Sequence, residues 1–196
     1  MERVRFYYDF TSPYTYLAST RVDALAARTG AEITWIPVLL GGILKATGNQ
    51  PPAMLPARAL YMPRDLERWA AFYGVPYRMS PHFPLNPLPA LRAACALSAQ
   101  RPEAYRPFVA ACFRAGWVDG LDLGDPAVWT TLAGETHRAF VTEAAAAPEW
   151  KDALKKNTEA AVTAGAFGAP AFVIGKDELY FGNDRLELLE WRLMRC

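Results

Sequence analysis

The sequence predicts an α/β fold in which the two ends of the chain build one sheet around a large all-helical insertion. Two observations predict this fold. Strand patterns occur near the two ends of the chain, at Arg3–Tyr8, Glu32–Pro37, 171–174 and 179–181. Between these ends, apolar residues recur at helical spacing. We therefore expect one domain formed by residues 1–40 plus 165–196 and a helical insertion domain over residues 41–164.

The N-terminal segment is predicted to form a strand–helix–strand unit. Polar and apolar residues alternate through Arg3–Tyr8, as in a half-buried strand. Ser12 and Pro13 then mark the start of a helix, with serine as N-cap and proline at the first helical position, and Gly30 marks its end. Because two strands joined by one helix are parallel, we expect Glu32–Pro37 to run parallel to the first strand.

The remaining elements follow from similar patterns. A turn composition at 175–178 separates the two C-terminal strands, and Asp184 opens a closing helix in capping-box spacing with Glu187. The segment 41–60 is expected to be irregular, because it holds paired glycines and paired prolines. The predicted helices of the insertion are 64–72, 89–99, 105–115, 126–133, 138–146 and 149–164.

Composition and charge exclude several classes of function. The chain has 21 basic and 20 acidic residues, so no basic excess is present to neutralise phosphates, and we expect no nucleic-acid partner. No apolar run approaches the ~20 residues of a membrane span, and the N-terminus lacks the apolar core of a signal peptide. We expect a cytoplasmic protein with no membrane partner.

The cysteine and histidine residues predict no metal site. Cys95, Cys112 and Cys196 show neither CxxC nor metal-ligand spacing, and their odd number disfavours a disulfide framework. His82 and His137 are isolated, so structural or surface roles are expected for them. We interpret Cys95 and Cys112, which lie in alanine-rich helical stretches, as small core residues. Dinucleotide-binding, P-loop, serine-hydrolase and zinc-protease motifs are absent from the sequence.

Ser12 is the first candidate for chemistry. As an N-cap it has a structural role, since its side chain can accept a hydrogen bond from the first turn. The same position also favours an anion, because free backbone N–H groups and the helix dipole stabilise negative charge there. A serine hydroxyl at this point can donate a hydrogen bond to a bound thiolate or carboxylate. The spacing alone leaves both interpretations open.

Other candidate ligand-binding residues lie near the C-terminus and in the irregular segment. A cis Ala169–Pro170 bond would leave the backbone of Ala169 free to pair with an extended peptide, although most X–Pro bonds are trans. Asp184 is a helix cap by position, and such a carboxylate can also receive a ligand ammonium. Lys45 and Asn49 can bind a carboxylate, but a lysine in a loop usually faces solvent.

Five blocks together resemble the 2-hydroxychromene-2-carboxylate isomerase family. They are 6–18 (FYYDFTSPYTYLA), 37–49 (PVLLGGILKATGN), 65–70 with 73–76, 167–172 (FGAPAF) and 181–185 (FGNDR). The resemblance implies a thioredoxin-like fold with a helical insertion, shared with kappa-class glutathione transferases and disulfide oxidoreductases. Where those oxidoreductases carry a CxxC pair, this chain has Ser12-Pro13-Tyr14-Thr15, so dithiol exchange is excluded at this point.

The resemblance also implies site residues and a cofactor, glutathione. Ser12 would be the catalytic residue, donating a hydrogen bond to the glutathione sulfur and so favouring the thiolate. Ala169 would pair through its backbone with the cysteinyl part, and Lys45 and Asn49 would meet a carboxylate of glutathione or substrate. The residues implied at the γ-glutamyl end are Phe181, Gly182, Asn183 and Asp184.

The implied reaction interconverts 2-hydroxychromene-2-carboxylate and trans-o-hydroxybenzylidenepyruvate, a step of naphthalene breakdown. The substrate would be a small aromatic carboxylate, and the family resemblance implies a homodimer. Two alternatives use the same residues. One is a kappa-like glutathione transferase or peroxidase, in which the thiolate attacks an electrophile, and the other is a non-catalytic module that binds glutathione or a peptide.

Overall fold

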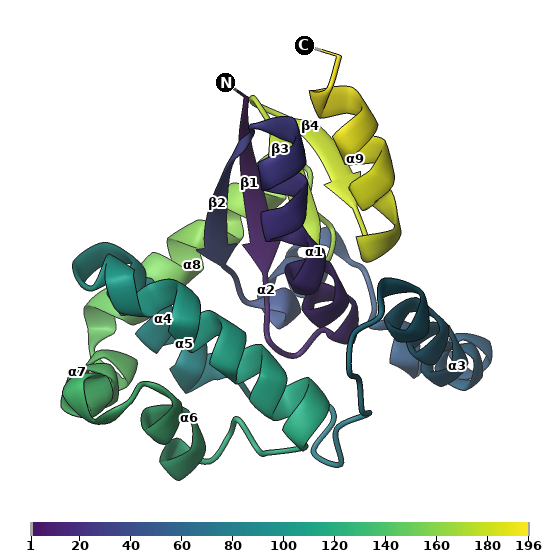
Figure 1. Cartoon of the computed structure of the whole chain (residues 1–196). Coiled ribbons are helices and arrows are strands. Elements are labelled where there is room, and N and C mark those ends of the chain that lie inside the picture. Colours follow the sequence, from purple (N-terminus) through teal and green to yellow (C-terminus); the bar gives the residue numbers. More distant parts are fainter. Residues whose placement is uncertain (1, 196) are drawn as a thin grey trace.

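The computed structural model describes residues 2–195 and contains one four-stranded sheet (Figure 1). The strands are β1 Arg3–Tyr8, β2 Glu32–Pro37, β3 Ala171–Ile174 and β4 Glu178–Phe181. Their order across the sheet is β2-β1-β3-β4, with β1 and β2 parallel and β3 antiparallel to both β1 and β4. The prediction that both chain ends build one sheet is therefore confirmed.

Helix α1, Pro13–Thr29, makes the connection between the two parallel strands. Pro13 occupies the first turn, where a missing N–H costs nothing, and the Ser12 side chain accepts a hydrogen bond from Thr15 N. The helix ends at Gly30, whose φ of 68° is left-handed and whose N–H donates to Ala26 O. Both predicted end signals are confirmed.

The sheet carries helices on both faces (Figure 1): α1 and α9 (Leu186–Leu193) on one, and the C-terminal half of α8 (Pro148–Thr163) on the other. Strand β1 alternates accordingly. Phe6 points to the α1 face and stacks on Phe172 with ring centroids 4.6 Å apart, whereas Tyr7 packs among small residues of α8. This layering is the thioredoxin-like arrangement that the sequence predicted.

The remaining helices form the insertion. They are α4 Leu88–Gln100, α5 Pro102–Arg114, the π-helical turn η2 Ala115–Asp119, α6 Pro126–Leu132 and α7 Glu135–Ala146. Each overlaps a predicted helix. Their buried residues join those under α1 in one continuous core. The packing therefore shows no break between the two predicted domains, and the domain boundaries at 40/41 and 164/165 stay a prediction.

The prediction of an irregular segment at 41–60 is wrong. The structure has three helices in this part of the chain: α2 Leu40–Thr47, η1 Pro52–Met54 and α3 Pro56–Tyr73. Gly42 lies within α2, and its lack of a side chain suits the close packing of α2 on α8, because a Cβ at this position would lie 3.0 Å from Thr158 Cγ2. Helix α3 begins at Pro56 instead of residue 64, and it continues through Pro63 because Met62 and Leu66 are buried on its inner face.

The prediction that Asp184 caps the closing helix is also wrong. A short 3₁₀ turn, η3 Asn183–Arg185, precedes α9, and the residue before α9 makes no side-chain capping bond. The Asp184 carboxylate instead accepts a hydrogen bond from Arg185 Nη1 at 2.5 Å. Within residues 2–195, no helix is both long and apolar enough to cross a membrane.

A buried tyrosine pair joins the insertion to the sheet, and it provides a test of that contact. Tyr105 Oη on α5 donates to Trp35 O at 2.9 Å and lies 3.1 Å from Tyr8 Oη. Tyr105→Phe is expected to lower the free energy of unfolding by about 1–3 kcal/mol, because it leaves the buried Trp35 O without this donor and the buried Tyr8 hydroxyl without its acceptor. Urea unfolding measures this loss. The matched control is Tyr61→Phe, which removes an exposed hydroxyl bound to Asp65; equal effects of the two variants would contradict the prediction.

Candidate functional site

The loop between β1 and α1 is fixed from the insertion side. Trp117, fully buried, donates from Nε1 to Phe10 O at 2.8 Å. Thr11 Oγ1 donates to Leu85 O at 3.0 Å. These two bonds hold the backbone that leads into Ser12, so the insertion sets the position of the candidate catalytic residue.

Ser12 lies buried between the start of α1 and the loop before β3. Its Oγ accepts a hydrogen bond from Thr15 N at 3.2 Å and donates to Ala169 O at 3.0 Å. The capping role is therefore confirmed. The hydroxyl also contacts Ala169, one of the residues implied in cofactor binding. Because the side chain is only 6% exposed, a ligand atom reaching Oγ would sit against the first turn of a 17-residue helix.

The Ala169–Pro170 peptide bond is cis, as the sequence suggested it could be. Ala169 O is occupied by Ser12, but Ala169 N–H has no hydrogen-bond partner among residues 2–195. Pro170 O accepts from Gly182 N at 3.0 Å. The cis-proline loop thus connects Ser12 to the β4–η3 corner and leaves one backbone donor free.

The β4–η3 corner contains the four residues implied at the γ-glutamyl end. The Phe181 ring packs on Phe167 at 4.3 Å between centroids, and Gly182 has a φ of 107°, a conformation that favours glycine. Asn183 is buried. Its side-chain Nδ2 donates to Tyr73 Oη, and Tyr73 Oη donates to the backbone carbonyl oxygen of Asn183. Its side chain is therefore engaged within the protein, whereas the Asp184 carboxylate is exposed.

Asn49 and Lys45 have different surroundings. Asn49 Nδ2 donates to Phe167 O at 2.9 Å, which brings the end of α2 next to the cis-proline loop. Lys45 is exposed on α2 and makes no hydrogen bond or ion pair within the described residues. Hydrogen bonds and ring contacts therefore connect Ser12, Ala169, the 181–184 corner and Asn49, but they do not reach Lys45.

Asp9 is a site residue that the sequence analysis missed. It is 1% exposed, and its carboxylate accepts hydrogen bonds from Thr11 N at 2.9 Å and from Leu40 N at 2.6 Å. Burial raises its pKa to about 6, and the two backbone bonds oppose this rise. Asp9 thus ties the loop before Ser12 to the start of α2. The only signal in the sequence is an acidic residue between aromatic ones at a strand end.

Known proteins resemble this chain over nearly its full length. The model of the DSBA-like thioredoxin domain matches residues 3–194. The chain belongs to this DSBA-like family. It is 35% identical to a Pseudomonas putida 2-hydroxychromene-2-carboxylate isomerase over 195 residues, covering 95% of this chain and 92% of the relative. It is 31% identical to human glutathione S-transferase kappa 1 over 205 residues, covering 95% and 88%.

A solved structure agrees with these relatives. The structure of a 2-hydroxychromene-2-carboxylate isomerase superposes with a TM-score of 0.85 at 29% identity, covering 98% of this chain and 95% of the other. The family resemblance and the thioredoxin-like fold are therefore confirmed. This DSBA-like protein is related both to isomerases and to glutathione transferases.

Cys95 and Cys112 of this DSBA-like domain are core residues, as predicted. Cys95 and Cys112 are buried and not disulfide-bonded. Burial raises the pKa of Cys95 to about 12 and the pKa of Cys112 well above its ordinary value, so both thiols stay protonated at neutral pH. Cys196 lies outside the described residues. Neither Cys95 nor Cys112 can therefore supply a thiolate at Ser12.

The histidines contribute nothing to the site. His82 is exposed, with its Nδ1 3.9 Å from Asp122 Oδ2. His137 lies in α7, a helix that contains none of the candidate residues. Across residues 2–195 the structure groups no three histidine, cysteine or acidic side chains as metal ligands.

Proposed function

We propose that this protein binds glutathione and uses its thiolate to interconvert 2-hydroxychromene-2-carboxylate and trans-o-hydroxybenzylidenepyruvate. One observation carries the proposal: the buried Ser12 hydroxyl lies at the N-terminus of α1 and within hydrogen-bond distance of the residue before a cis proline. A sulfur atom held there would receive a hydrogen bond and the field of the helix terminus, and both favour the thiolate.

The free donors and charges around Ser12 suit the parts of glutathione. The unpaired N–H of Ala169 would bond the cysteinyl backbone in the manner of a short strand. The exposed Asp184 carboxylate, which accepts a hydrogen bond from Arg185 in the ligand-free protein, would also pair with the γ-glutamyl ammonium, and the Phe181–Asn183 backbone would border that end. Lys45 and Asn49 are proposed to meet a carboxylate of glutathione or substrate, Asn49 from beside the cis-proline loop.

The proposed reaction needs a nucleophile that is returned unchanged. The thiolate adds to the conjugated side chain of the ring-opened form, so that a C–S bond forms and the electron pair of the double bond moves towards the carbonyl. The former double bond then rotates as a single bond. Elimination breaks the C–S bond and releases the thiolate. In the resulting cis form the phenol oxygen adds to the ketone carbon and its proton passes to the carbonyl oxygen, which closes the chromene ring; the reverse direction opens the ring first. Ser12 donates to the sulfur before addition and after elimination, which stabilises the leaving group of the second step.

A kappa-like transferase is the second candidate function, and the 31% identity to human glutathione S-transferase kappa 1 favours it. The same Ser12 thiolate would attack an electrophile and remain attached. Product analysis separates the two: the isomerase returns all the glutathione as free thiol, whereas conjugation of a generic aryl halide consumes it. Tight glutathione binding without turnover of either substrate would indicate a binding module.

A cytoplasmic location and a homodimer belong to the same proposal. Glutathione serves as a thiol in a reducing compartment, so a glutathione-dependent enzyme is expected there. Light scattering on the purified protein measures the mass. A mass near twice 21.7 kDa supports the dimer, and a mass near 21.7 kDa contradicts it.

Asp184 provides a test of the glutathione end of the site. Asp184→Asn is expected to raise the KM for glutathione about tenfold with little change in kcat, because it removes one charge-assisted contact made equally in the ground and transition states. Steady-state kinetics at varied glutathione measures both constants. The control is Asp177→Asn, on the exposed β3–β4 turn. A KM that stays at the wild-type value would remove Asp184 from the proposed site.

A further inference from the structure

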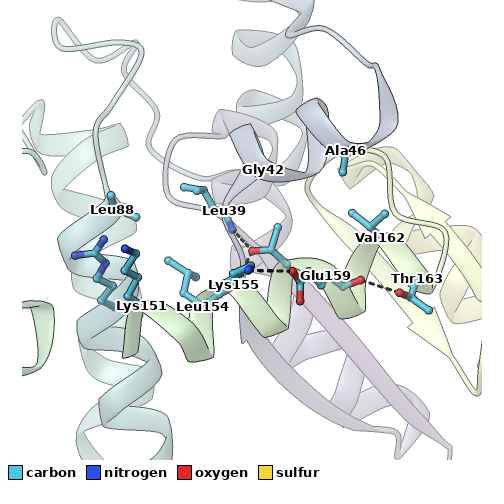
Figure 2. Close-up of a pocket in the computed structure, with 12 residues that line it drawn as sticks. Leu39, Gly42, Ala46, Leu88, Lys151, Leu154, Lys155, Glu159, Val162 and Thr163 are labelled. Carbon is cyan, nitrogen blue, oxygen red and sulfur yellow. Dashed lines mark hydrogen bonds and ion pairs between the residues drawn. The ribbon is translucent and has the colours of Figure 1, made fainter. Parts of the chain in front are cut away.

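A second possible ligand site lies between α2, α8 and the start of α4. Here the structure has an open pocket of about 620 Å³, bordered by Leu39 just before α2, by Ala46 from α2 and by Leu88 from α4 (Figure 2). We call it the α2–α8 pocket. None of the residues proposed for glutathione or catalysis lines it. Its volume is in the range of pockets that hold small organic ligands.

The charges of the α2–α8 pocket are mostly positive. Its lining includes Arg92, Lys151 and Lys155 but only one carboxylate, that of Glu159. Glu159 lies 3.8 Å from Lys155 Nζ, so these two charges offset each other. Neither Arg92 nor Lys151 has an ion-pair partner among residues 2–195. For a chain with a net charge of only +1, two uncompensated cations in one pocket are a local excess.

The two cations lie towards one end of the pocket. Figure 2 shows Lys151 and Leu88 at one end, and Ala46 and Val162 at the other. Arg92 follows Leu88 by four residues on α4, so the two share one face of that helix. The Arg92 guanidinium is held in place, because its Nη1 donates to Ala145 O at 3.1 Å. The pocket therefore has its two uncompensated cations at one end, and Ala46 and Val162 provide apolar surface at the other, beside Thr163.

We propose that the α2–α8 pocket binds a small amphipathic carboxylate. The carboxylate would lie near Lys151 and Arg92, and its ring or chain would extend along Leu39 towards Ala46 and Val162. Apolar walls supply the burial free energy, and the two cations select an anionic head over a neutral one. This site goes beyond the proposed function, because it requires neither glutathione nor Ser12.

Calorimetric titration of the whole protein with 2-naphthoate, without glutathione, tests the proposal. Saturable binding is expected. Lys151→Gln should weaken it about fivefold, the range of one partly exposed charge contact. Lys176→Gln, on the exposed β3–β4 turn, is the matched control and should leave the affinity within about twofold. Neutral 2-naphthol should bind about tenfold more weakly than the carboxylate, since it cannot use the two cations.

A second variant tests the apolar end. Ala46 is exposed on α2, so Ala46→Trp fills the pocket from its edge without entering the core, and it should abolish saturable binding. Circular dichroism checks that the variant is folded. No saturable binding to wild type, or equal affinity in Lys151→Gln or in folded Ala46→Trp, would overturn the proposal. Competition by glutathione would overturn it too, because it would place the carboxylate in the glutathione site. These experiments measure binding and not turnover, so a negative result would not bear on the proposed isomerase activity.

Discussion

Ser12→Ala is expected to lower kcat/KM for glutathione-dependent turnover by about 10- to 150-fold. The variant removes the donor to the sulfur, and a hydrogen bond to a charged group contributes about 1.5–3 kcal/mol. In the ligand-free protein the hydroxyl donates to Ala169 O, so binding of a thiolate would exchange a neutral acceptor for a charged one. The pKa of the bound glutathione thiol should rise by about 1–2 units in the variant, since one unit corresponds to 1.36 kcal/mol.

Two measurements separate this role from simple capping. Thiolate absorbance against pH gives the pKa of bound glutathione, which a capping role alone would not move. Urea unfolding gives the capping contribution, expected to be about 1 kcal/mol. Ser19→Ala is the control: it lies on the same helix and its Oγ donates to Tyr16 O, away from Ala169. Unchanged turnover in Ser12→Ala would exclude Ser12 from the chemistry.

The free energy of unfolding should carry a pH dependence that comes from Asp9. Burial raises the pKa of this carboxyl from its ordinary 3.8 to about 6, so the folded state holds the proton more tightly than the unfolded state. The stabilisation by protonation is complete below about pH 4 and is lost as the pH rises through 6. At 1.36 kcal/mol per unit, the loss is about 3 kcal/mol.

Asp9→Asn tests this origin. Its side chain does not titrate, so the difference in unfolding free energy between wild type and variant should change by about 3 kcal/mol between pH 4 and pH 7, in favour of the variant at the higher pH. Urea unfolding across this range measures the difference, with the surface variant Asp177→Asn as control. Parallel pH profiles for wild type and Asp9→Asn would show that Asp9 ionises in the fold as readily as in the unfolded chain.

The parts of the fold that depend on local signals could be predicted from the sequence. Ser12, Pro13 and Gly30 each act within one turn of their own position, and the structure has α1 where they indicate. The four strands likewise follow from alternation and turn composition. The resemblance added the thioredoxin-like arrangement, which the structure and the relatives confirm.

The failures depend on contacts between distant segments. Gly42 is typical of a loop by composition, but it lies in a helix that packs closely against Thr158, more than a hundred residues later. Asp184 has the spacing of a helix cap, but its carboxylate accepts a hydrogen bond from its neighbour Arg185 instead of from the first turn of α9. Asp9 connects the loop before Ser12 to α2 through its hydrogen bond from Leu40 N, and no periodicity in the sequence predicts that contact.

The candidate site divides in the same way. Ser12 could be placed at a helix start, but its bond to Ala169 joins residues 157 positions apart and required the fold. Asn183 lies in the 181–185 block that resembles the isomerase family, and the resemblance implied that it binds the cofactor. In the structure its side-chain amide is already hydrogen-bonded to Tyr73. The α2–α8 pocket draws its cations from α4 and α8, so the sequence alone could not reveal it.

The central claim is that a bound thiolate beside Ser12 performs the isomerisation. Absorbance-monitored conversion of 2-hydroxychromene-2-carboxylate by the purified protein, with and without glutathione, tests it most directly. We expect turnover only when glutathione is present, with its concentration unchanged at the end. Turnover at the same rate without glutathione would contradict the thiolate mechanism, and no turnover by folded protein with glutathione would contradict the proposed reaction.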